Sequence, residues 1–147
     1  MDVQLAAESA TDLESVEQLL ISAQLPHGGL RAQFPPAYVV ARDERAIVGI
    51  AGLEHYGDVG LLRSVAVTGA RRGAGVGRLL VANRLAHARE SRLSAVYLLT
   101  TTASDYFTRL DFAPASRAEV PADLQASEEF ARACPASAAC LVWRPNP

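Results

Sequence analysis

The clearest chemical signal in the sequence is the glycine-rich run Arg72-Gly73-Ala74-Gly75-Val76-Gly77-Arg78. It follows an apolar, strand-like run that ends at Val67, and it leads into a helical pattern that starts near Gly75. Backbone N–H groups at a helix start attract anions, and glycine lacks the Cβ atom that would keep a phosphate at a distance. We therefore predict that this run binds a phosphorylated ligand.

Two other kinds of phosphate loop do not match the run. A Walker loop ends in Gly-Lys followed by Ser or Thr, whereas this chain has Gly77-Arg78-Leu79. A dinucleotide-binding loop requires a third glycine where Arg78 stands and an acidic residue closing the next strand, and the run Ala95 to Thr101 has none. A glycine-rich connector without a ligand is the remaining alternative.

Hydrophobic periodicity and the positions of Pro and Gly predict the elements that place this run. The predicted strands are Val3 to Ala7, Tyr38 to Ala41, Ile47 to His55, Leu61 to Val67, Ala95 to Leu99 and Ala139 to Trp143. The predicted helices lie between a capping box at Thr11 and Pro26, from about Gly75 to about Arg92, near Ser104 to Leu110 and near Ser127 to Cys134. The short turns between the second, third and fourth strands favour an antiparallel meander. The helix before the wholly apolar run at Ala95 favours a parallel strand pair, and hence a mixed α/β sheet with helices on both faces.

Composition sets limits on the class of protein. A chain of 147 residues that is 50% hydrophobic and 20% charged matches one globular domain over residues 1–147. A formal net charge of -2 gives no overall field that attracts nucleic acid or an anionic membrane, so we expect neither partner. The sequence has no basic, apolar signal segment and no long apolar span, so we expect a cytoplasmic protein. Cys134 and Cys140 have no neighbouring histidine, and we expect neither a disulfide framework nor a metal site.

Two motifs resemble those of the Gcn5-related N-acetyltransferases. Val65-Ala66-Val67, four residues and then Arg72-x-x-Gly75-x-Gly77 are similar to the coenzyme A signature of that family. The later Ala103-x-x-x-Phe107-x-Arg109-x-Asp111-Phe112 is similar to its next motif, Ala-x-x-x-Tyr-x-Lys-x-Gly-Phe. The order of the predicted elements also matches the family over nearly the whole chain.

This resemblance implies both a fold and a cosubstrate. The fold is a mixed, mostly antiparallel sheet of six to seven strands with a central parallel pair. The cosubstrate is acetyl-CoA, with its pyrophosphate on the run Arg72 to Arg78. The backbone of Val65 to Val67 then pairs with the pantetheine arm and polarises the thioester carbonyl. The partner is a small-molecule amine, and the resemblance leaves room for a homodimer through the last strands.

The second motif departs from the family at the residue that often protonates the departing thiolate. Phe107 stands where the family often has Tyr, and a phenyl ring has no proton to donate. Tyr106 is adjacent and is the candidate general acid, although one step along a helix turns a side chain by about 100°. Direct protonation of the thiolate by water, or by the ammonium proton relayed from the substrate, remains open. Asp111 replaces the usual Gly, which indicates a left-handed turn that Asp tolerates.

An amine acceptor must lose a proton before it attacks a thioester, which requires a base. Glu54 and His55 lie on the strand before the cofactor strand, and because strand residues alternate faces only one of them can face the site. Glu54 is the favoured base. The alternative is an exposed carboxylate at a strand end.

Arg63 lies in the apolar context Leu61-Leu62-Arg63-Ser64-Val65, where an unpaired charge would be costly. It either forms an internal ion pair, for which Glu54 is the candidate partner, or binds a carboxylate or phosphonate of the substrate. Thr100 stands where many family members have Asn, and its hydroxyl either contacts the pantetheine or substrate or caps the strand end locally.

A narrower resemblance concerns the acceptor. The run from Val96 to Phe107, with Val120-Pro121, is similar to small acetyltransferases that accompany bacterial arsenic-resistance genes and, more distantly, to N-acetylglutamate synthase catalytic domains. This implies an amino acid or a glutamate-like acceptor, such as an organoarsenical or phosphinic amino acid. Two alternatives remain open, namely an acetyl-CoA-binding sensor without turnover and a protein N-acetyltransferase.

Overall fold

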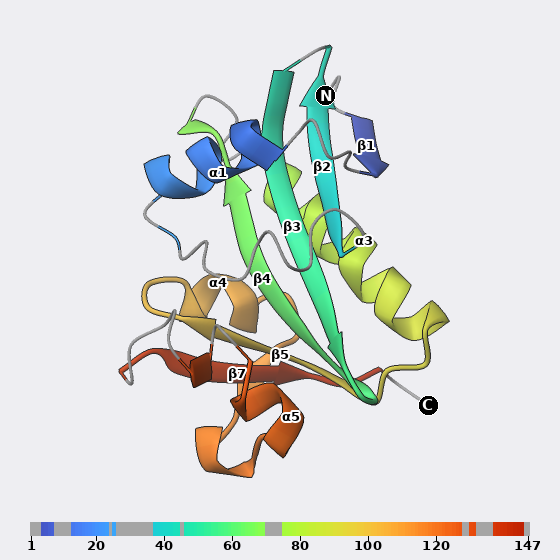
Figure 1. The fold of residues 1–147 in the computed structure, drawn as a ribbon, viewed down its shortest axis with the longest axis vertical. Coiled ribbons are helices and arrows are strands. Elements are labelled where there is room, and N and C mark those ends of the chain that lie inside the picture. The colour runs from blue at the N-terminus through green and yellow to red at the C-terminus, as the bar shows by residue number, and fades with distance from the viewer. Residues whose placement is uncertain are drawn as a thin grey trace.

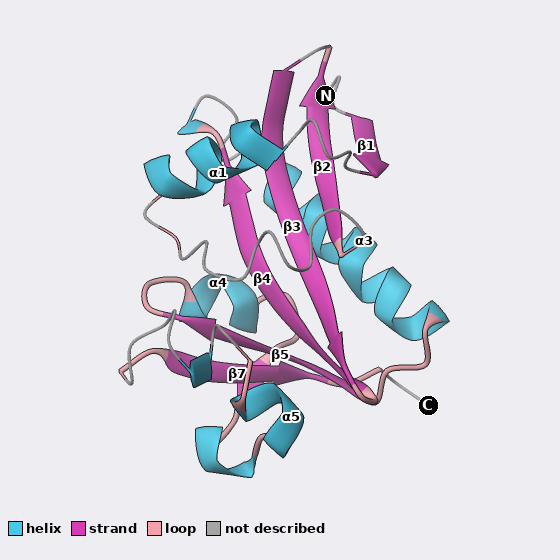
Figure 2. Ribbon diagram, in the orientation of Figure 1, coloured by secondary structure: helices cyan, strands magenta, loops and turns pink. Residues whose placement is uncertain are grey.

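The structure is a computed structural model that describes residues 4–7, 13–23, 25, 37–44, 46–69, 75–127, 130–131 and 137–145. Within these residues seven strands form one sheet in the order β1-β2-β3-β4-β5-β7-β6 (Figures 1 and 2). The strands are β1 (Gln4–Ala7), β2 (Tyr38–Asp43), β3 (Ala46–Tyr56), β4 (Val59–Val67), β5 (Ala95–Thr100), β6 (Ala113–Pro114) and β7 (Ala139–Trp143). The helices are α1 (Leu13–Ser22), α3 (Val76–Glu90), α4 (Ser104–Thr108), α5 (Ala122–Gln125) and the 3-10 turn η3 (Arg117–Glu119). The predicted mixed sheet is confirmed.

The antiparallel meander is formed by β2, β3 and β4. A tight turn at Gly57 and Asp58 joins β3 to β4, and Gly57 has a φ of 65°, a conformation that glycine adopts without steric cost. β3 is flanked by strands on both sides, and most of its residues are buried, as expected for the centre of a sheet. Strands β2 and β3 therefore support β4 along one of its edges.

The predicted parallel pair consists of β4 and β5, joined by α3, and it is short. Along these two described strands the ladder covers Val59–Leu61 on β4 and Ala95–Tyr97 on β5, and no pairing continues beyond it. Figure 1 shows the two strands meeting at one end and separating toward the other. Beyond Leu61, the ladder between the described strands β4 and β5 ends, and the two strands diverge.

A β-bulge in β4 accompanies this separation. Ile50 of β3 pairs with Ala66 and Gly52 pairs with Arg63, so two residues of β4, Ser64 and Val65, stand opposite one residue of β3. Ser64 has a φ of 61° in the left-handed region. A bulge bends its strand and increases the local twist, which is the physical reason that β4 turns away from β5 at this point.

Helices cover both faces of the sheet. On one face, α3 and Phe107 of α4 pack against strand side chains that include Leu53 and Leu62. On the other face the buried side of α1 packs on Tyr38 and Ile50, while Leu124 of α5 packs on Leu61. Among the described helices none is long and apolar enough to cross a membrane.

The C-terminal part of the chain differs from expectation in its details. The predicted helix from Ser127 to Cys134 lies mostly outside the described residues, and the structure instead shows α5 at Ala122–Gln125. Strand β6 and the turn η3 have no periodic pattern because each is only two or three residues long, and the sequence does not predict them. Thr11 and Cys134 also lie outside the described residues, whereas Cys140 is a buried free thiol.

Gly52 is predicted to be essential to the packing of β3. A Cβ atom at this position would lie 2.5 Å from the ring of buried Tyr38. We expect Gly52→Ala to lower the free energy of unfolding by about 1–3 kcal/mol because the ring must move within a packed core. Denaturant unfolding measures the change. Gly69→Ala is the matched control, since a Cβ at Gly69 meets no atom within 4 Å; equal stability of the two variants would contradict the prediction.

Candidate active site

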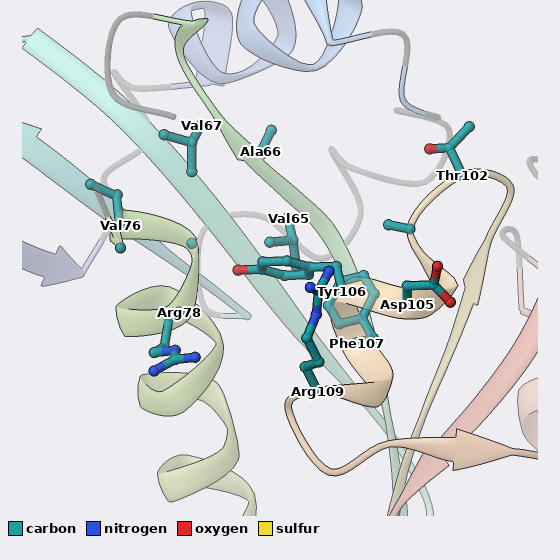
Figure 3. Close-up of a pocket in the computed structure, with 13 residues that line it drawn as sticks. Val65, Ala66, Val67, Val76, Arg78, Thr102, Asp105, Tyr106, Phe107 and Arg109 are labelled. Atoms are coloured by element: carbon teal, nitrogen blue, oxygen red, sulfur yellow. The ribbon is translucent and has the colours of Figure 1, made fainter. Parts of the chain in front are cut away.

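A cavity of about 870 Å³ lies where β4 has separated from β5. Three segments line it: Val65 to Val67 of β4, the first residues of α3 with Gly75 before them, and α4 with the loop preceding it (Figure 3). The two motifs of the sequence, which are about thirty residues apart, therefore form opposite walls of one site.

The helix-start wall has the features expected of an anion site. Gly75 caps α3 with a φ of 85°, and no side chain hydrogen-bonds to the cap. The first N–H groups of a helix have no intrahelical partner and carry the positive end of its dipole, so this end of α3 favours a negatively charged ligand. Gly75, Val76, Gly77 and Arg78 all line the cavity, and their binding of a pyrophosphate stays a prediction. Arg72, Gly73 and Ala74 lie outside the described residues, so their roles stay predictions.

The β4 wall presents main chain to the cavity. Ala66 and Val67 pair with β3 on one side, through Ile50 and Gly49, while β5 forms no ladder with them on the other side. A strand edge beyond the end of its ladder can accept an extended ligand as an additional strand partner. This geometry suits a pantetheine arm, which carries amide groups at intervals along its length.

Tyr106 and Phe107 point in different directions from α4. Phe107 is buried in the core, with its ring 5.8 Å from that of Phe112 in an edge contact. Tyr106 keeps 36% of its surface exposed and extends across the cavity toward α3 (Figure 3). Its hydroxyl lies against Gly77, 2.7 Å from where a Cβ atom would stand. Partial burial raises the pKa of the Tyr106 phenol, and Arg78 opposes this shift.

Two cationic side chains face the cavity from opposite walls. Arg78 belongs to α3 and Arg109 follows α4, while Asp105 is the acidic residue in the lining (Figure 3). Sequence reasoning did not assign a role to Arg109, Thr102, Ala103 or Asp105. The signal for Arg109 was present, because it occupies the basic position of the second motif.

Glu54 and Arg63 lie on the opposite face of the sheet, the face covered by α1 and α5. Gly52 pairs directly with Arg63, and strand alternation puts Glu54 on the same face as Gly52. Glu54 Oε2 and Arg63 Nη1 are 3.6 Å apart, and their side chains are 2% and 0% exposed. The predicted internal ion pair is therefore present. His55 points to the other face, where its ring lies 5.4 Å from that of His87.

Burial and local partners set the electrostatics of this pair. Burial raises the pKa of the Glu54 carboxyl, whereas the hydrogen bond from Tyr56 and the charge of Arg63 lower it. The Tyr56 hydroxyl donates a hydrogen bond to Glu54 Oε1 at 2.6 Å. Burial, followed by the hydrogen bond to Glu54, raises the pKa of Tyr56. Arg63 Nε in turn donates to the Ser64 hydroxyl at 3.2 Å, and the Tyr38 hydroxyl lies 3.4 Å from the same oxygen.

Two further sequence predictions concern single residues. The Thr100 hydroxyl accepts a hydrogen bond from the backbone N–H of Ala103 at 3.0 Å, which is the local cap rather than a ligand contact. Thr102 and Ala103 line the cavity, and Thr100 does not. Asp111 has a φ of 74°, which confirms the left-handed turn. Among the described residues no group of three or more His, Cys, Asp or Glu side chains could hold a metal ion.

Comparison with known families agrees with this geometry. The model of the acetyltransferase (GNAT) family matches residues 5–112, which is more than half of the chain. The chain belongs to the acetyltransferase (GNAT) family. No curated protein sequence matches it significantly.

Solved structures of several acetyltransferases share the fold. N-acetylglutamate synthase from Neisseria gonorrhoeae, complexed with coenzyme A and L-arginine, aligns with a TM-score of 0.84 and 21% identity over 99% of this chain. This chain spans only 34% of the length of that synthase. Rv2747 from Mycobacterium tuberculosis, in complex with CoA and NLQ, gives a TM-score of 0.79 and 20% identity, with 97% of this chain and 99% of that chain covered. The ribosomal-protein-S18-alanine N-acetyltransferase from Escherichia coli gives 0.70 and 14%, with 97% and 93% covered. At these identities the likeness establishes the fold alone.

The GNAT assignment predicts that Gly75 is required for cofactor binding. Gly75→Asp adds a side chain at a φ of 85° and a negative charge at the start of α3, where the pyrophosphate would bind. We expect the variant to lose its thermal stabilisation by acetyl-CoA, whereas the native chain gains about 2.7 kcal/mol at 100 times the dissociation constant. Gly69→Asp is the control, because Gly69 is exposed and does not line the cavity. A folded Gly75→Asp protein that binds acetyl-CoA normally would show that the pyrophosphate site is assigned to the wrong residues.

Proposed function

We propose that this chain transfers the acetyl group of acetyl-CoA to the primary amine of a small, carboxylate-bearing acceptor. An amino acid or a glutamate-like analogue, including phosphinic and arsenical forms, is the class of acceptor we favour. The observation that carries the proposal is the pairing of Glu54 with Arg63 next to the bulge of the cofactor strand. A base and an anion-binding group thus stand together on one side of β4, while the cofactor cavity opens on its far half.

Glu54 is the proposed general base. The acceptor ammonium gives a proton to the Glu54 carboxylate, and the freed amine nitrogen attacks the thioester carbonyl carbon. An amide C–N bond forms while the C–S bond breaks, and the net reaction releases one proton to solvent. Burial makes the carboxylate a stronger proton acceptor, because its charged form has lost its water.

Val65, Ala66 and Val67 are proposed to hold the pantetheine arm along the open edge of β4 and to direct a backbone N–H at the thioester carbonyl. Gly75 to Arg78 would hold the pyrophosphate, with Arg78 adding a positive charge to that of the helix end. Acetyl-CoA itself supplies the activated acyl group. The protein's part is to fix the distance and direction of attack and to polarise the carbonyl.

Tyr106 is the proposed general acid. Its phenol lies in the cofactor cavity, and partial burial raises its pKa, so it carries a proton at neutral pH that the departing thiolate can take. Phe107 is enclosed in the core and has no such proton. The phenolate then regains a proton from solvent.

A small acceptor suits this site better than a protein segment. Glu54 and Arg63 are almost wholly buried, and a closed site favours a compact ligand over an extended chain lying in an open groove. Arg63 is proposed to bind the carboxylate or phosphonate of the acceptor through the planar fork of its guanidinium. The acceptor anion would then share Arg63 with Glu54.

A single series of measurements tests the proposed function. Release of free thiol from acetyl-CoA is followed across amino acids, their phosphinic and arsenical analogues, and peptide N termini, alongside the melting temperature. We expect thiol release with acidic amino acids and none with peptides. Stabilisation by acetyl-CoA without thiol release would favour a sensor, release with peptides alone would favour a protein acetyltransferase, and the absence of stabilisation would refute coenzyme binding.

Arg63→Lys tests the anion-binding role of the guanidinium. Lysine keeps the positive charge beside buried Glu54 but loses the bidentate fork, so the fold is spared the cost of an unpaired buried carboxylate. We expect KM for an acidic acceptor to rise at least about tenfold, the loss of roughly one charge-assisted hydrogen bond. KM for acetyl-CoA should not change. The control is Arg144→Lys at an exposed position after β7; an unaltered acceptor KM in Arg63→Lys would remove Arg63 from the acceptor site.

A further inference from the structure

The two carboxylate oxygens of Glu54 have different surroundings, because Tyr56 contacts only one of them. Both residues belong to β3 and, two positions apart, share one face of the sheet. The Tyr56 hydroxyl donates to Oε1 at 2.6 Å, a short distance typical of a hydrogen bond to a charged acceptor. Oε2 is buried, lies 3.6 Å from Arg63 Nη1, and accepts no hydrogen bond among the described residues. One oxygen is therefore fixed while the other keeps its capacity to accept.

Such an arrangement is costly unless it serves a ligand. Buried carboxylate oxygens are normally satisfied by hydrogen bonds, since burial removes the water that would otherwise bind them. A purely structural ion pair would gain by closing the 3.6 Å gap to hydrogen-bond distance. Instead, the carboxylate plane is held by Tyr56, and Oε2 retains a lone pair for a donor that the described residues do not supply.

Tyr56 is itself held in place from two directions. Its ring is half-buried against the cluster that contains Leu61, Leu124 and Phe130. Ser127, a buried residue just after α5, acts on the phenol and lowers the pKa of Tyr56. A group that donates toward a hydroxyl oxygen makes that hydroxyl a stronger donor in its own next hydrogen bond. Ser127 is therefore proposed to strengthen the bond that fixes Glu54.

We propose that Tyr56 is a positioning residue for the acetyl-transfer reaction, holding Glu54 so that Oε2 faces the acceptor amine. The proposal rests on the proposed function, because it gives Glu54 the role of base. Ser127 supports Tyr56 in this task, and neither residue touches the reacting atoms. A primary ammonium group matches this buried carboxylate oxygen, because its N–H can donate a hydrogen bond to the unused lone pair of Oε2.

The hydrogen bond also sets the pH range in which Glu54 works. A donor to the carboxylate stabilises the charged form, so loss of the Tyr56 hydroxyl raises the pKa of Glu54 further above its ordinary value. The other charged group that faces this carboxyl from the described elements is Arg63 on β4, and His55 lies on the opposite face. Because a base acts when deprotonated, the acid limb of the rate profile must then move to higher pH.

Tyr56→Phe tests the proposal through the pH dependence of kcat/KM for the acceptor. We expect the acid limb to shift upward, so that the rate deficit is largest at low pH and shrinks as the pH rises. KM for acetyl-CoA should stay constant. Tyr97→Phe is the matched control, since Tyr97 is buried in the same cluster and loses the same atom. A purely structural role for Tyr56 would lower the melting temperature and leave the limb in place.

Glu54→Gln separates the two levels of the argument. If its profile keeps the native acid limb, Glu54 is not the base and the proposed role of Glu54 fails. If the acid limb disappears in Glu54→Gln, Glu54 is the base. If the limb then keeps its native pH in Tyr56→Phe, the positioning role of Tyr56 is overturned. Should Tyr56→Phe fail to fold, Ser127→Ala carries the test, because it weakens the same bond and must move the limb in the same direction.

Discussion

The separation of β4 from β5 is the feature on which every other part of the site depends. Parallel strands ordinarily continue as neighbours, and here the ladder ends after Leu61 and Tyr97. The β-bulge at Ser64 and Val65 gives β4 a left-handed step that a continuous strand lacks. From that point the β5 side of β4 faces a cavity instead of another strand. Both the start of α3 and the side chains of α4 then meet across the space that the bulge has opened.

A left-handed conformation at a serine needs support from its surroundings, since a Cβ atom makes this region of φ unfavourable. The support comes from side chains on the α1 face. Tyr38 of β2 and the Nε atom of Arg63 both approach the Ser64 hydroxyl. The ring of Tyr38 lies flat over Gly52, where no other residue would leave it room. The bulge is thus connected through Arg63 to Glu54, so the main chain that would hold the cofactor and the proposed base share one set of contacts.

The parts of this site that were predictable from sequence are the local ones. The start of α3 at Gly75 follows from a glycine beside a helical pattern, and the placement of Glu54 and His55 on opposite faces follows from strand alternation. The burial of Glu54 does not follow from alternation, and an exposed carboxylate was the open alternative. The left-handed turn at Asp111 was also predictable, because it depends only on the backbone conformation of that one residue. The parallel pair was predictable from the helical pattern followed by the wholly apolar run at Ala95, and the family resemblance agreed with it.

Other features depend on contacts between distant segments and left no local signal. Ser64 is an ordinary residue in an apolar strand pattern, and its bulge becomes visible only when β3 is placed beside β4. The hydrogen bond from Tyr56 to Glu54 could be predicted only if one knew which rotamers the packing of α5 permits. The 3.6 Å contact of Glu54 with Arg63 was one of two open alternatives in the sequence, and register alone decides it. At Thr100 the sequence left a local cap and a ligand contact open, and the structure shows the cap, in which the hydroxyl accepts from the backbone N–H of Ala103.

The two sides of β4 use charge in physically different ways. In the cofactor cavity Arg78 is exposed, so water screens its charge and its main effect is to attract and orient an anionic ligand. On the α1 face, Glu54 and Arg63 are removed from water. Unit charges interact more strongly there, so protonation of Glu54 changes the electrostatic energy of the pair more than it would in water. The proposed reaction needs both conditions at once, because a large anionic cosubstrate must bind reversibly while the proposed base removes one proton from the acceptor amine. The bulge meets this requirement by placing a screened cavity and a dehydrated ion pair within a few residues of one strand.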